Sequence, residues 1–164
     1  MIEIGDKAPE FTLLNQDDKK VSLIDFAGKW LVLYFYPKDD TPGCTTEACD
    51  FTDGLADFSN LDAAVVGVSG DSTESHRNFI AKYKLAIPLL SDPERVVHKA
   101  YGAWGLKKNY GKEYEGTIRS TFIISPSGQI AAKWNNVNVR VKRGDNEVKH
   151  ANLVQEKLTE LRAK

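Results

Sequence analysis

The segment WLVLYFY at residues 30–36 runs directly into PKDDTPGCTTEAC at residues 37–49. The first segment is apolar or aromatic at every position, which is typical of a strand buried on both faces in the middle of a sheet. The second segment predicts a helix that begins near Pro42, because proline suits the first position of a helix. A buried strand that leads into a helix predicts an α/β fold.

Both cysteines of the chain, Cys44 and Cys49, lie in this predicted helix. A helix N-terminus offers unpaired N–H groups and the positive end of the helix dipole, and both favour a thiolate over a thiol. Gly43 and the polar residues 45–47 surround Cys44 and argue against deep burial. We therefore predict that Cys44 is a reactive thiol rather than a small buried apolar residue, which is the alternative for a free cysteine.

The spacing of the two cysteines limits the chemistry that they can do. They are 49 − 44 = 5 residues apart, so an ideal helix places their side chains roughly 140° apart and their Cα atoms about 8 Å or more apart. A disulfide tolerates about 7 Å. Either the helix unwinds when they bond, or they never bond. The spacing also excludes the Cys-x-x-Cys motif of dithiol oxidoreductases.

A zinc site is a further alternative for the cysteines. It would need His76, His98 or His150 as additional ligands, but the sequence contains no His-x₃₋₅-His pair. We instead interpret each histidine as a solvated helix residue or one with its own hydrogen-bond partner.

The overall composition narrows the function classes. A chain of 164 residues predicts a single domain, residues 1–164. Its formal net charge of −1 gives no electrostatic reason to expect binding to nucleic acid or to an anionic membrane. No apolar run approaches the roughly 20 residues that cross a bilayer, and the first residues do not resemble a signal peptide. We therefore expect a cytoplasmic protein, in which two cysteines are catalytic or metal-binding rather than structural.

The remaining elements surround the central strand. Residues 11–14 and 21–24 predict an N-terminal β-hairpin, residues 103–116 a loop, and residues 137–150 an irregular segment with one short strand at most. The other predicted elements are strands at 63–68, 87–90, 120–125 and 129–134, a first helix that continues through Phe51, Leu55 and Phe58, and helices that begin at Ser72, at Pro93 with Asp92 as N-cap, and at Asn152. This order predicts a three-layer α/β/α sandwich of thioredoxin type with a central mixed sheet.

The motif Pro37-x-x-x-Thr41-x-x-Cys44 resembles the active-site pattern of the peroxiredoxins, and every position of the pattern is filled. A second cysteine five residues later resembles the bacterioferritin-comigratory-protein (PrxQ) subgroup. Residues 104–122 are similar to the loop and following strand of the same subgroup. The resemblance extends from about residue 6 to residue 134, and we transfer no role to residues beyond it.

This resemblance implies a role for each motif residue. Cys44 would be the peroxidatic cysteine, which attacks the peroxide and becomes a sulfenic acid. Cys49 would be the resolving cysteine, which condenses with the sulfenic acid to an intramolecular disulfide. Thr41 would hold the peroxide, Arg119 would hold the thiolate and the peroxide, and Pro37 would shield the site from water. An arginine suits this role because it is always charged and presents several donors.

From the residue types alone, two of these residues also allow an interpretation without a role in the site. Arg119 is equally compatible with a surface arginine opposite Glu113 or Glu115, and Thr41 with an ordinary turn residue. The assignment of both residues to the site therefore depends on the resemblance.

Three further residues are expected to support the site: Gly43, Glu47 and Trp104. Glu47 would help to position the site, although an acidic residue in the first turn of a helix is also favoured by the helix dipole alone. Trp104 and Tyr110 would line the pocket or contact the reductant, and the alternative for both is simple packing.

The resemblance implies a thiol peroxidase without cofactor or metal, which reduces hydrogen peroxide and organic hydroperoxides. Thioredoxin is the expected reductant, with a glutaredoxin-type protein second. A monomer is expected, and a dimer through a surface patch is the alternative. A redox-sensing or chaperone-like module that uses the same cysteine pair without efficient turnover is the rival function, and a zinc-binding domain is a third.

Overall fold

The computed structural model describes residues 2–109 and 111–164. In chain order the elements are β1 (Thr12–Asn15), β2 (Lys20–Ser22), the 3₁₀-helix η1 (Leu23–Phe26), β3 (Trp30–Phe35), α1 (Pro42–Asp53), α2 (Leu55–Asn60), β4 (Ala63–Ser69), α3 (Thr73–Tyr83), β5 (Leu89–Ser91), α4 (Val96–Ala100), β6 (Trp104–Asn109), β7 (Lys112–Thr117), β8 (Ser120–Ile124), β9 (Ile130–Trp134), β10 (Arg140–Arg143), β11 (Asn146–Lys149) and α5 (His150–Arg162).

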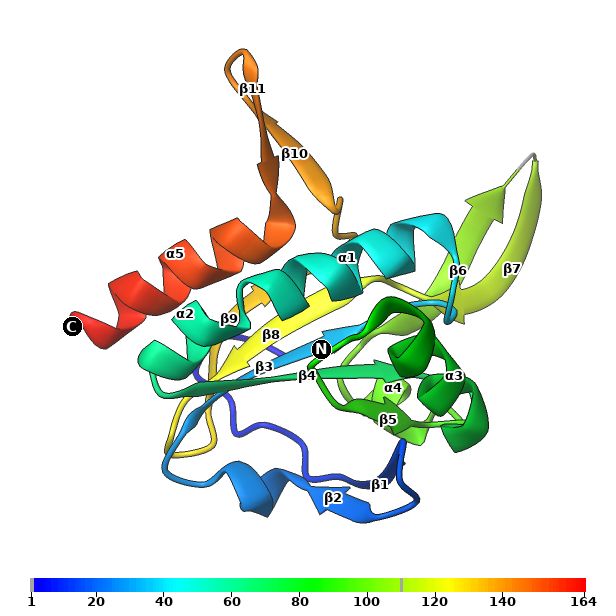
Figure 1. Ribbon diagram of the computed structural model, residues 1–164, viewed down its shortest axis with the longest axis horizontal. Coiled ribbons are helices and arrows are strands. Elements are labelled where there is room, and N and C mark those ends of the chain that lie inside the picture. The colour runs from blue at the N-terminus through cyan, green and yellow to red at the C-terminus, as the bar shows by residue number, and fades with distance from the viewer. Residues whose placement is uncertain (1, 110) are drawn as a thin grey trace.

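Strand β3 lies near the middle of a seven-stranded sheet with the order β2-β1-β5-β4-β3-β8-β9 (Figure 1). It pairs in parallel with β4 and antiparallel with β8, so the sheet is mixed. Residues 31–35 of β3 are all buried. The predicted central strand is therefore confirmed, and its continuous apolar sequence follows from burial on both faces.

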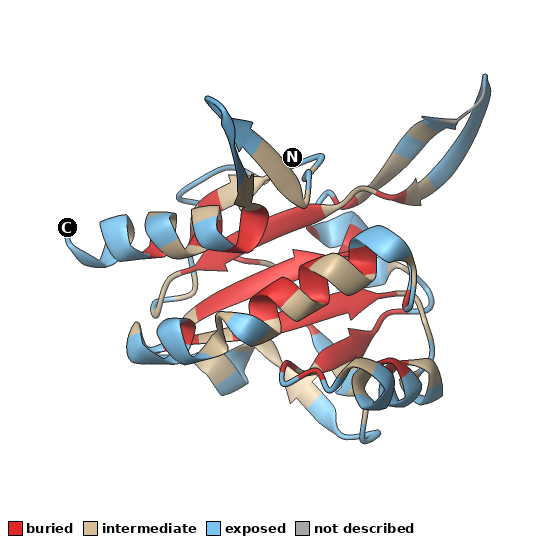
Figure 2. Ribbon diagram, turned by 45° about the horizontal axis from the view of Figure 1, so that its top comes forward, coloured by how far each residue is buried: buried red, intermediate tan, exposed pale blue. Residues whose placement is uncertain are grey.

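Alternate side chains of β3 face two different hydrophobic clusters. Val32 and Tyr34 pack in the cluster to which α1, α2, α3 and α5 contribute, whereas Leu31 and Leu33 pack in the cluster formed with α4 and the N-terminal segment. Figure 2 shows the buried strands between helices whose outer faces are exposed. The predicted three-layer arrangement is confirmed.

The N-terminal hairpin is also confirmed, because β1 pairs antiparallel with β2. Its second strand is shorter than predicted. Residues 23–26 form η1 instead, and the carboxylate of Asp25 accepts a hydrogen bond from the Ser22 backbone N–H at 2.8 Å.

The first helix does not continue as predicted through Leu55 and Phe58. It ends at Asp53, and Gly54 separates it from α2. Glycine is the weakest helix former after proline, so a break at this position agrees with its propensity. Phe51 and Phe58 still bury their rings in the same cluster.

The predicted helix start at Asp92 and Pro93 is wrong. Helix α4 begins at Val96, and the residue before it, Arg95, has a left-handed backbone with φ +62°. The Asp92 carboxylate instead accepts hydrogen bonds from the backbone N–H and the ring Nδ1 of His98, at 2.9 and 2.7 Å. Asp92 therefore caps the helix from a tight turn rather than from the residue that precedes it.

Two segments predicted as irregular form β-hairpins. Strands β6 and β7 pair within the predicted loop at residues 103–116, and β10 and β11 pair within residues 137–150. Both hairpins project from the main sheet and are largely exposed in Figure 2. Strands that bury neither face show no apolar alternation, so the pattern that identifies a strand was absent from both segments.

Gly67 of β4 allows a stability test of this sheet. A Cβ at this position would lie 2.8 Å from the ring of Tyr34 and 2.9 Å from Leu89, and both of these side chains are buried. We expect Gly67→Ala to lower the free energy of unfolding by about 2 kcal/mol, because overpacked cores displace their neighbours. Urea denaturation of the reduced protein measures this change.

Gly54→Ala is the matched control, because the nearest atom to its Cβ would be 3.5 Å away and its φ is −89°. We expect this control to change the free energy of unfolding by less than about 1 kcal/mol. Equal stability of the Gly67→Ala variant and the wild type would contradict the tight packing between β3, β4 and β5.

Candidate active site

Helix α1 begins where the sequence predicts, with Pro42 at its first position. Thr41 is the N-cap residue in an extended conformation, but its side chain makes no cap hydrogen bond. Its Oγ1 donates instead to the carbonyl of Lys38 at 2.8 Å. The Thr41 carbonyl accepts the Thr45 backbone N–H at 2.8 Å, which makes it the first acceptor of the helix.

Three side chains form a hydrogen-bonded chain at the start of α1. Arg119 donates from Nη2 to the sulfur of Cys44 at 3.2 Å and from Nη1 to Oε1 of Glu47 at 2.6 Å. The Arg119 side chain is 16% exposed and that of Glu47 is 1% exposed. The interpretation of Arg119 as a surface residue opposite Glu113 or Glu115 is therefore wrong, because it pairs with a buried carboxylate inside the site.

Gly43 makes room for this arginine. A Cβ at Gly43 would lie 3.2 Å from Nη2 of Arg119, which is closer than most real Cβ contacts. The absence of a side chain therefore lets the guanidinium lie over the first turn of α1 and reach the Cys44 sulfur.

The prediction that Cys44 is not deeply buried is wrong, since it is only 1% exposed. It packs in the core with Tyr34, Tyr36 and Ala48, which is one helical turn further along α1. Thr45 and Thr46, the two residues that follow Cys44, point in other directions, because successive side chains of a helix are about 100° apart, and the polar Glu47 is itself buried. Polar neighbours in the sequence therefore do not report the exposure of a helical residue.

Burial also changes the ionisation of Glu47. Desolvation raises the pKa of this carboxyl to about 7, although the nearby Arg119 charge opposes the rise. Its Oε1 accepts from Arg119, whereas its Oε2 has no hydrogen-bond partner within the described residues. The carboxyl is therefore held on one side by the same arginine that contacts the Cys44 thiol.

Cys49 lies in the same unbroken helix as Cys44 and is partly exposed. Both cysteines are free thiols in this structure. Burial, together with the carboxylates of Asp53 and Asp50, raises the pKa of the Cys49 thiol. Cys49 is therefore the more accessible of two thiols that an intact helix keeps apart, and its surroundings disfavour its thiolate.

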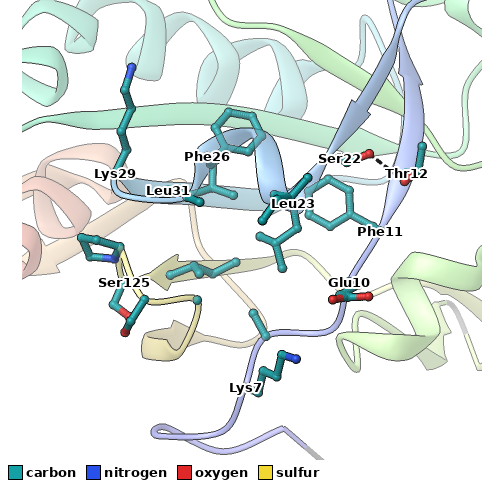
Figure 3. Close-up of a pocket in the computed structure, with 17 residues that line it drawn as sticks. Lys7, Glu10, Phe11, Thr12, Ser22, Leu23, Phe26, Lys29, Leu31 and Ser125 are labelled. Carbon is teal, nitrogen blue, oxygen red and sulfur yellow. Dashed lines mark hydrogen bonds between the residues drawn. The ribbon is translucent and has the colours of Figure 1, made fainter.

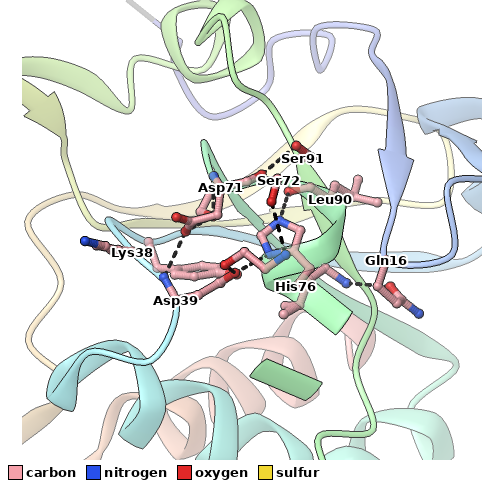
Figure 4. A network of polar contacts seen from close by, with 12 residues as sticks. Gln16, Lys38, Asp39, Asp71, Ser72, His76, Leu90 and Ser91 are labelled. Carbon is pink, nitrogen blue, oxygen red and sulfur yellow. Dashed lines mark hydrogen bonds and ion pairs between the residues drawn. The ribbon is translucent and has the colours of Figure 1, made fainter. Parts of the chain in front are cut away.

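A buried polar network fixes the loop between β3 and α1 (Figure 4). The Asp39 carboxylate accepts hydrogen bonds from the hydroxyl of Tyr36 at 2.6 Å and of Ser75 at 2.8 Å, and it pairs with Nδ1 of His76 at 2.7 Å. The Asp39 backbone N–H donates to the carboxylate of Asp71 at 2.8 Å. Helix α3 therefore anchors the loop that carries Pro37 and Thr41. The sequence predicts no role for Asp39, because a contact between residues 39 and 76 leaves no spacing signal in a single sequence.

Two of the predicted site residues lie apart from this hydrogen-bonded chain. The Trp104 indole N–H donates to Glu115 at 3.3 Å, and its ring lies under the Arg95 guanidinium, 5.2 Å from the ring centroid. These contacts favour the packing alternative for Trp104. Pro37 is half-buried in the loop before α1, and Tyr110 lies outside the described residues.

A cavity that none of the motif residues lines lies beside the N-terminal hairpin (Figure 3). Its volume is about 640 Å³, and it lies between the N-terminal hairpin, η1 and the β8–β9 turn. Phe11, Leu23 and Phe26 form much of its wall. None of its described lining residues belongs to the motif at 37–44, so the chemistry of the site does not depend on it.

The histidines do not approach the cysteines as zinc ligands would. His76 pairs with Asp39 and His98 with Asp92, both at 2.7 Å, and His150 is hydrogen-bonded to Thr121 at 2.8 Å. All three histidines are buried and hydrogen-bonded. The interpretation that each has its own hydrogen-bond partner is therefore confirmed, and the alternative that they are solvated is wrong. Over residues 2–109 and 111–164, no three His, Cys, Asp or Glu side chains are grouped as metal ligands.

Comparison with known proteins identifies the family. The model of the AhpC/TSA family matches residues 4–133. The chain belongs to this family. It is 51% identical over 139 residues to Peroxiredoxin Bcp of Bacillus subtilis (strain 168), an alignment that covers 85% of this chain and 88% of the relative. It is 47% identical over 138 residues to a putative peroxiredoxin bcp of Coxiella burnetii, covering 84% of this chain and 91% of the relative.

Solved structures of peroxiredoxins have the same fold. A cysteine-to-serine mutant of Xylella fastidiosa PrxQ superposes with a TM-score of 0.88 at 37% identity, covering 100% of this chain and 99% of that one. The bacterioferritin comigratory protein of Xanthomonas campestris, studied for alkyl peroxide reduction in trapped intermediate and ligand complexes, superposes with a TM-score of 0.86 at 39% identity, covering 100% and 99%. The predicted thioredoxin-like fold and the resemblance to the PrxQ subgroup are both confirmed.

The chain is therefore a peroxiredoxin, a thiol-dependent peroxidase with two cysteines. Within the described residues, this peroxiredoxin has no helix that is both long and apolar enough to cross a membrane.

The raised pKa of Glu47 predicts a pH dependence of stability. The carboxyl titrates near 4.5 in the unfolded chain and at about 7 in the folded peroxiredoxin. Between these values the folded protein keeps a proton that the unfolded chain has lost, so the free energy of unfolding falls as the pH rises through this window. Glu47→Gln removes the titrating group. We expect the stability of the wild type relative to this variant to fall by up to roughly 3 kcal/mol between pH 4.5 and pH 8.

Urea denaturation of the reduced proteins at both pH values measures this difference. Glu74→Gln, at an exposed glutamate on α3, is the control, and we expect no such trend. A difference between wild type and Glu47→Gln that stays constant over the range would show that Arg119 keeps Glu47 ionised throughout.

Proposed function

We propose that Cys44 is the peroxidatic cysteine of this peroxiredoxin and that Cys49 is the resolving cysteine. The Cys44 thiolate attacks one oxygen of the peroxide, the O–O bond breaks, and the other oxygen leaves with a proton as water or an alcohol. Cys44 becomes a sulfenic acid. The Cys49 thiol then displaces the hydroxyl as water and forms the Cys44–Cys49 disulfide. The observation that carries this proposal is the hydrogen bond from Arg119 to the Cys44 sulfur.

The proposed role of Arg119 is to hold the thiolate and the leaving oxygen together. A guanidinium presents several donors in one plane, so Nη2 can contact the sulfur while other N–H groups reach a bound peroxide. Glu47 fixes the guanidinium from the opposite side through its 2.6 Å hydrogen bond. We assign Glu47 and Gly43 as positioning residues on this basis.

Thr41 and Pro37 belong to the same loop and receive the roles that the motif implies. In the proposed complex, the Thr41 hydroxyl turns from the Lys38 carbonyl, which it contacts at 2.8 Å, to the peroxide. Pro37 shields the Cys44 side of the loop. Because the backbone at Gly43 is exposed and Cys44 is not, we propose that the peroxide enters beside Gly43 and under Arg119.

The resolving step requires a change in α1. Both cysteines lie within this helix, Pro42–Asp53, and an intact helix keeps their Cα atoms about 8 Å or more apart. The helix must therefore unwind locally before the two sulfurs can approach to bonding distance. An external dithiol then reduces the disulfide by thiol–disulfide exchange.

We propose thioredoxin as this dithiol, with a glutaredoxin-type protein as the second candidate. We further propose that the chain acts as a single domain, in the cytoplasm and as a monomer. These proposals rest on the composition and the subgroup resemblance, and the turnover arm of the following experiment tests the reductant directly.

Mass spectrometry after one equivalent of peroxide tests the two cysteine roles. We expect the intact wild-type protein to lose two hydrogens and its peptides to contain a Cys44–Cys49 bridge. Cys49→Ser should instead retain one oxygen on Cys44, because the sulfenic acid has no partner. Repeated peroxide consumption with a thioredoxin system separates an enzyme from a sensor that oxidises once. Oxygen found on Cys49 in Cys44→Ser, with full peroxidase activity, would reverse the assignment.

Arg119→Ala tests where the rate enhancement originates. An ordinary thiol with a pKa near 8.5 is about 3% ionised at pH 7, so full ionisation gains at most about thirtyfold. The remainder must come from alignment of the peroxide and stabilisation of the leaving oxygen. We therefore expect Arg119→Ala to slow the first oxidation step by far more than about thirtyfold in stopped-flow measurements.

Arg95→Ala is the control for loss of a partly buried arginine outside the site. The Arg95 guanidinium lies over the ring of Trp104, which is not part of the hydrogen-bonded chain of Cys44, Arg119 and Glu47. We expect its oxidation rate to stay within about twofold of wild type. A loss of about tenfold or less in a folded Arg119→Ala variant would contradict the proposed role of Arg119.

A further inference from the structure

The C-terminal part of the chain contacts the active-site helix from a segment that lies beyond the family match, which ends at residue 133. Strands β10 and β11 form a hairpin that projects from the body of the molecule between β9 and α5 (Figure 1). The segment that leads into it is tied to the site, because the Val137 backbone N–H donates to the Arg119 carbonyl at 2.9 Å. The base of the hairpin is held in turn by the His150 N–H, which donates to Val139 at 2.9 Å.

Two cations of this hairpin converge on one carboxylate of α1. Arg140 donates from Nη1 to Oδ2 of Asp50 and from Nη2 to Oδ1 at 3.2 Å, so that the pair is bidentate. The ammonium of Lys149 lies 3.7 Å from Oδ1. The Asp50 side chain is 6% exposed and that of Arg140 is 33% exposed. A bidentate, charge-assisted pair is geometrically more specific than an ordinary surface ion pair, and loss of one partner leaves the nearly buried carboxylate with less compensation.

Asp50 is the residue directly after Cys49. We propose that Arg140 is a positioning residue that clamps α1 at Asp50 and thereby sets the rate at which Cys49 is released to attack the oxidised Cys44. This inference rests on the proposed resolving role of Cys49. While the clamp is closed, α1 stays helical around Cys49 and the two sulfurs cannot meet.

The clamped state also keeps Cys49 a poor nucleophile. Burial and the Asp53 and Asp50 carboxylates raise the pKa of its thiol, and the thiolate is the attacking species. When α1 opens at Asp50, Cys49 can approach Cys44 and its thiol becomes exposed to solvent. Arg140 therefore opposes the resolving step through the position of the helix, without contacting either sulfur.

A slow resolving step has a chemical consequence for Cys44. A sulfenic acid that waits under Arg119 can react with a second peroxide: one oxygen is transferred to sulfur, the O–O bond breaks, and water or an alcohol leaves. The product is a sulfinic acid, which no longer forms the disulfide. The rate at which the clamp opens therefore determines which fraction of the oxidised protein becomes disulfide and which fraction becomes sulfinic acid when peroxide is in excess.

The same hairpin provides a matched control. Arg143 forms a bidentate pair with Glu156 of α5, with distances of 3.3 and 3.1 Å, and both side chains are 58% exposed. This pair joins the hairpin to α5 rather than to α1. Arg143→Ala therefore removes an arginine from the hairpin without releasing the clamp.

Rapid-quench mass spectrometry measures the two steps separately in the full-length protein. The reduced wild type, Arg140→Ala and Arg143→Ala are mixed with one equivalent of hydrogen peroxide and sampled for sulfenic acid and disulfide. We expect Arg140→Ala to form the disulfide about tenfold faster, with oxidation of Cys44 unchanged within about twofold. With excess peroxide, its sulfinic acid fraction should fall by a similar factor. Arg143→Ala should match the wild type in both measurements.

Asp50→Asn removes the charge of the same pair with little change of shape and is read in parallel, in case Arg140→Ala folds poorly. We expect it to accelerate disulfide formation in the same direction. A rate of disulfide formation within about twofold of wild type in both variants would contradict the proposal. It would mean that α1 unwinds before the resolving step without any opening of the Arg140–Asp50 pair. If no variant, wild type included, forms a Cys44–Cys49 bridge, the proposed function fails instead.

Discussion

The hydrogen bond between Arg119 and the sulfur of Cys44 depends on the register between β3 and β8. Phe35, at the end of β3, lies opposite Ser120 at the start of β8. Arg119 therefore stands just beyond the end of β3, at the place where the chain turns into α1. A slip of one residue would turn the guanidinium to the opposite face of the sheet. The central apolar strand thus positions the chemistry as well as the core.

The same guanidinium contacts both the Cys44 sulfur and the Glu47 carboxyl, so the protonation of Glu47 changes the electrostatic field at the sulfur. Arg119 contacts the Cys44 sulfur at 3.2 Å and the Glu47 carboxylate at 2.6 Å. A proton on Glu47 leaves the whole positive charge to the sulfur, whereas an ionised Glu47 shares it. Because burial raises the pKa of Glu47 to about 7, both forms are populated near neutral pH. The arginine therefore faces a thiol whose electrostatic surroundings respond to pH through a neighbour that does not react.

The sequence was sufficient for the parts of the molecule that local patterns determine. Residues 30–36 identify the central strand, and Pro42 identifies the start of α1. The family resemblance places Arg119 beside Cys44. The sequence was not sufficient for contacts between distant residues, such as Glu47 with Arg119 or Asp39 with His76, because their spacing leaves no periodic signal. The two exposed hairpins were missed for a different reason, since strands that bury neither face do not alternate in hydrophobicity. The burial of Cys44 was missed because the exposure of a helical residue depends on what lies across from it, here the core around Tyr34 and Tyr36.

The composition of α1 agrees with the proposed local unwinding of this helix. Its sequence, PGCTTEACDFTD, contains glycine, three threonines, two cysteines and two aspartates, all of which are weaker helix formers than alanine or leucine. A helix of 12 residues with this composition has little stability of its own. It is held instead by tertiary contacts: Arg119 at Glu47, Arg140 at Asp50, and the packing of Phe51 in the core. Loss of one such contact shifts the balance between helix and coil locally while the sheet beneath stays intact. The helix is therefore ordered when its external partners are engaged, and it can open at the turn where a partner is lost.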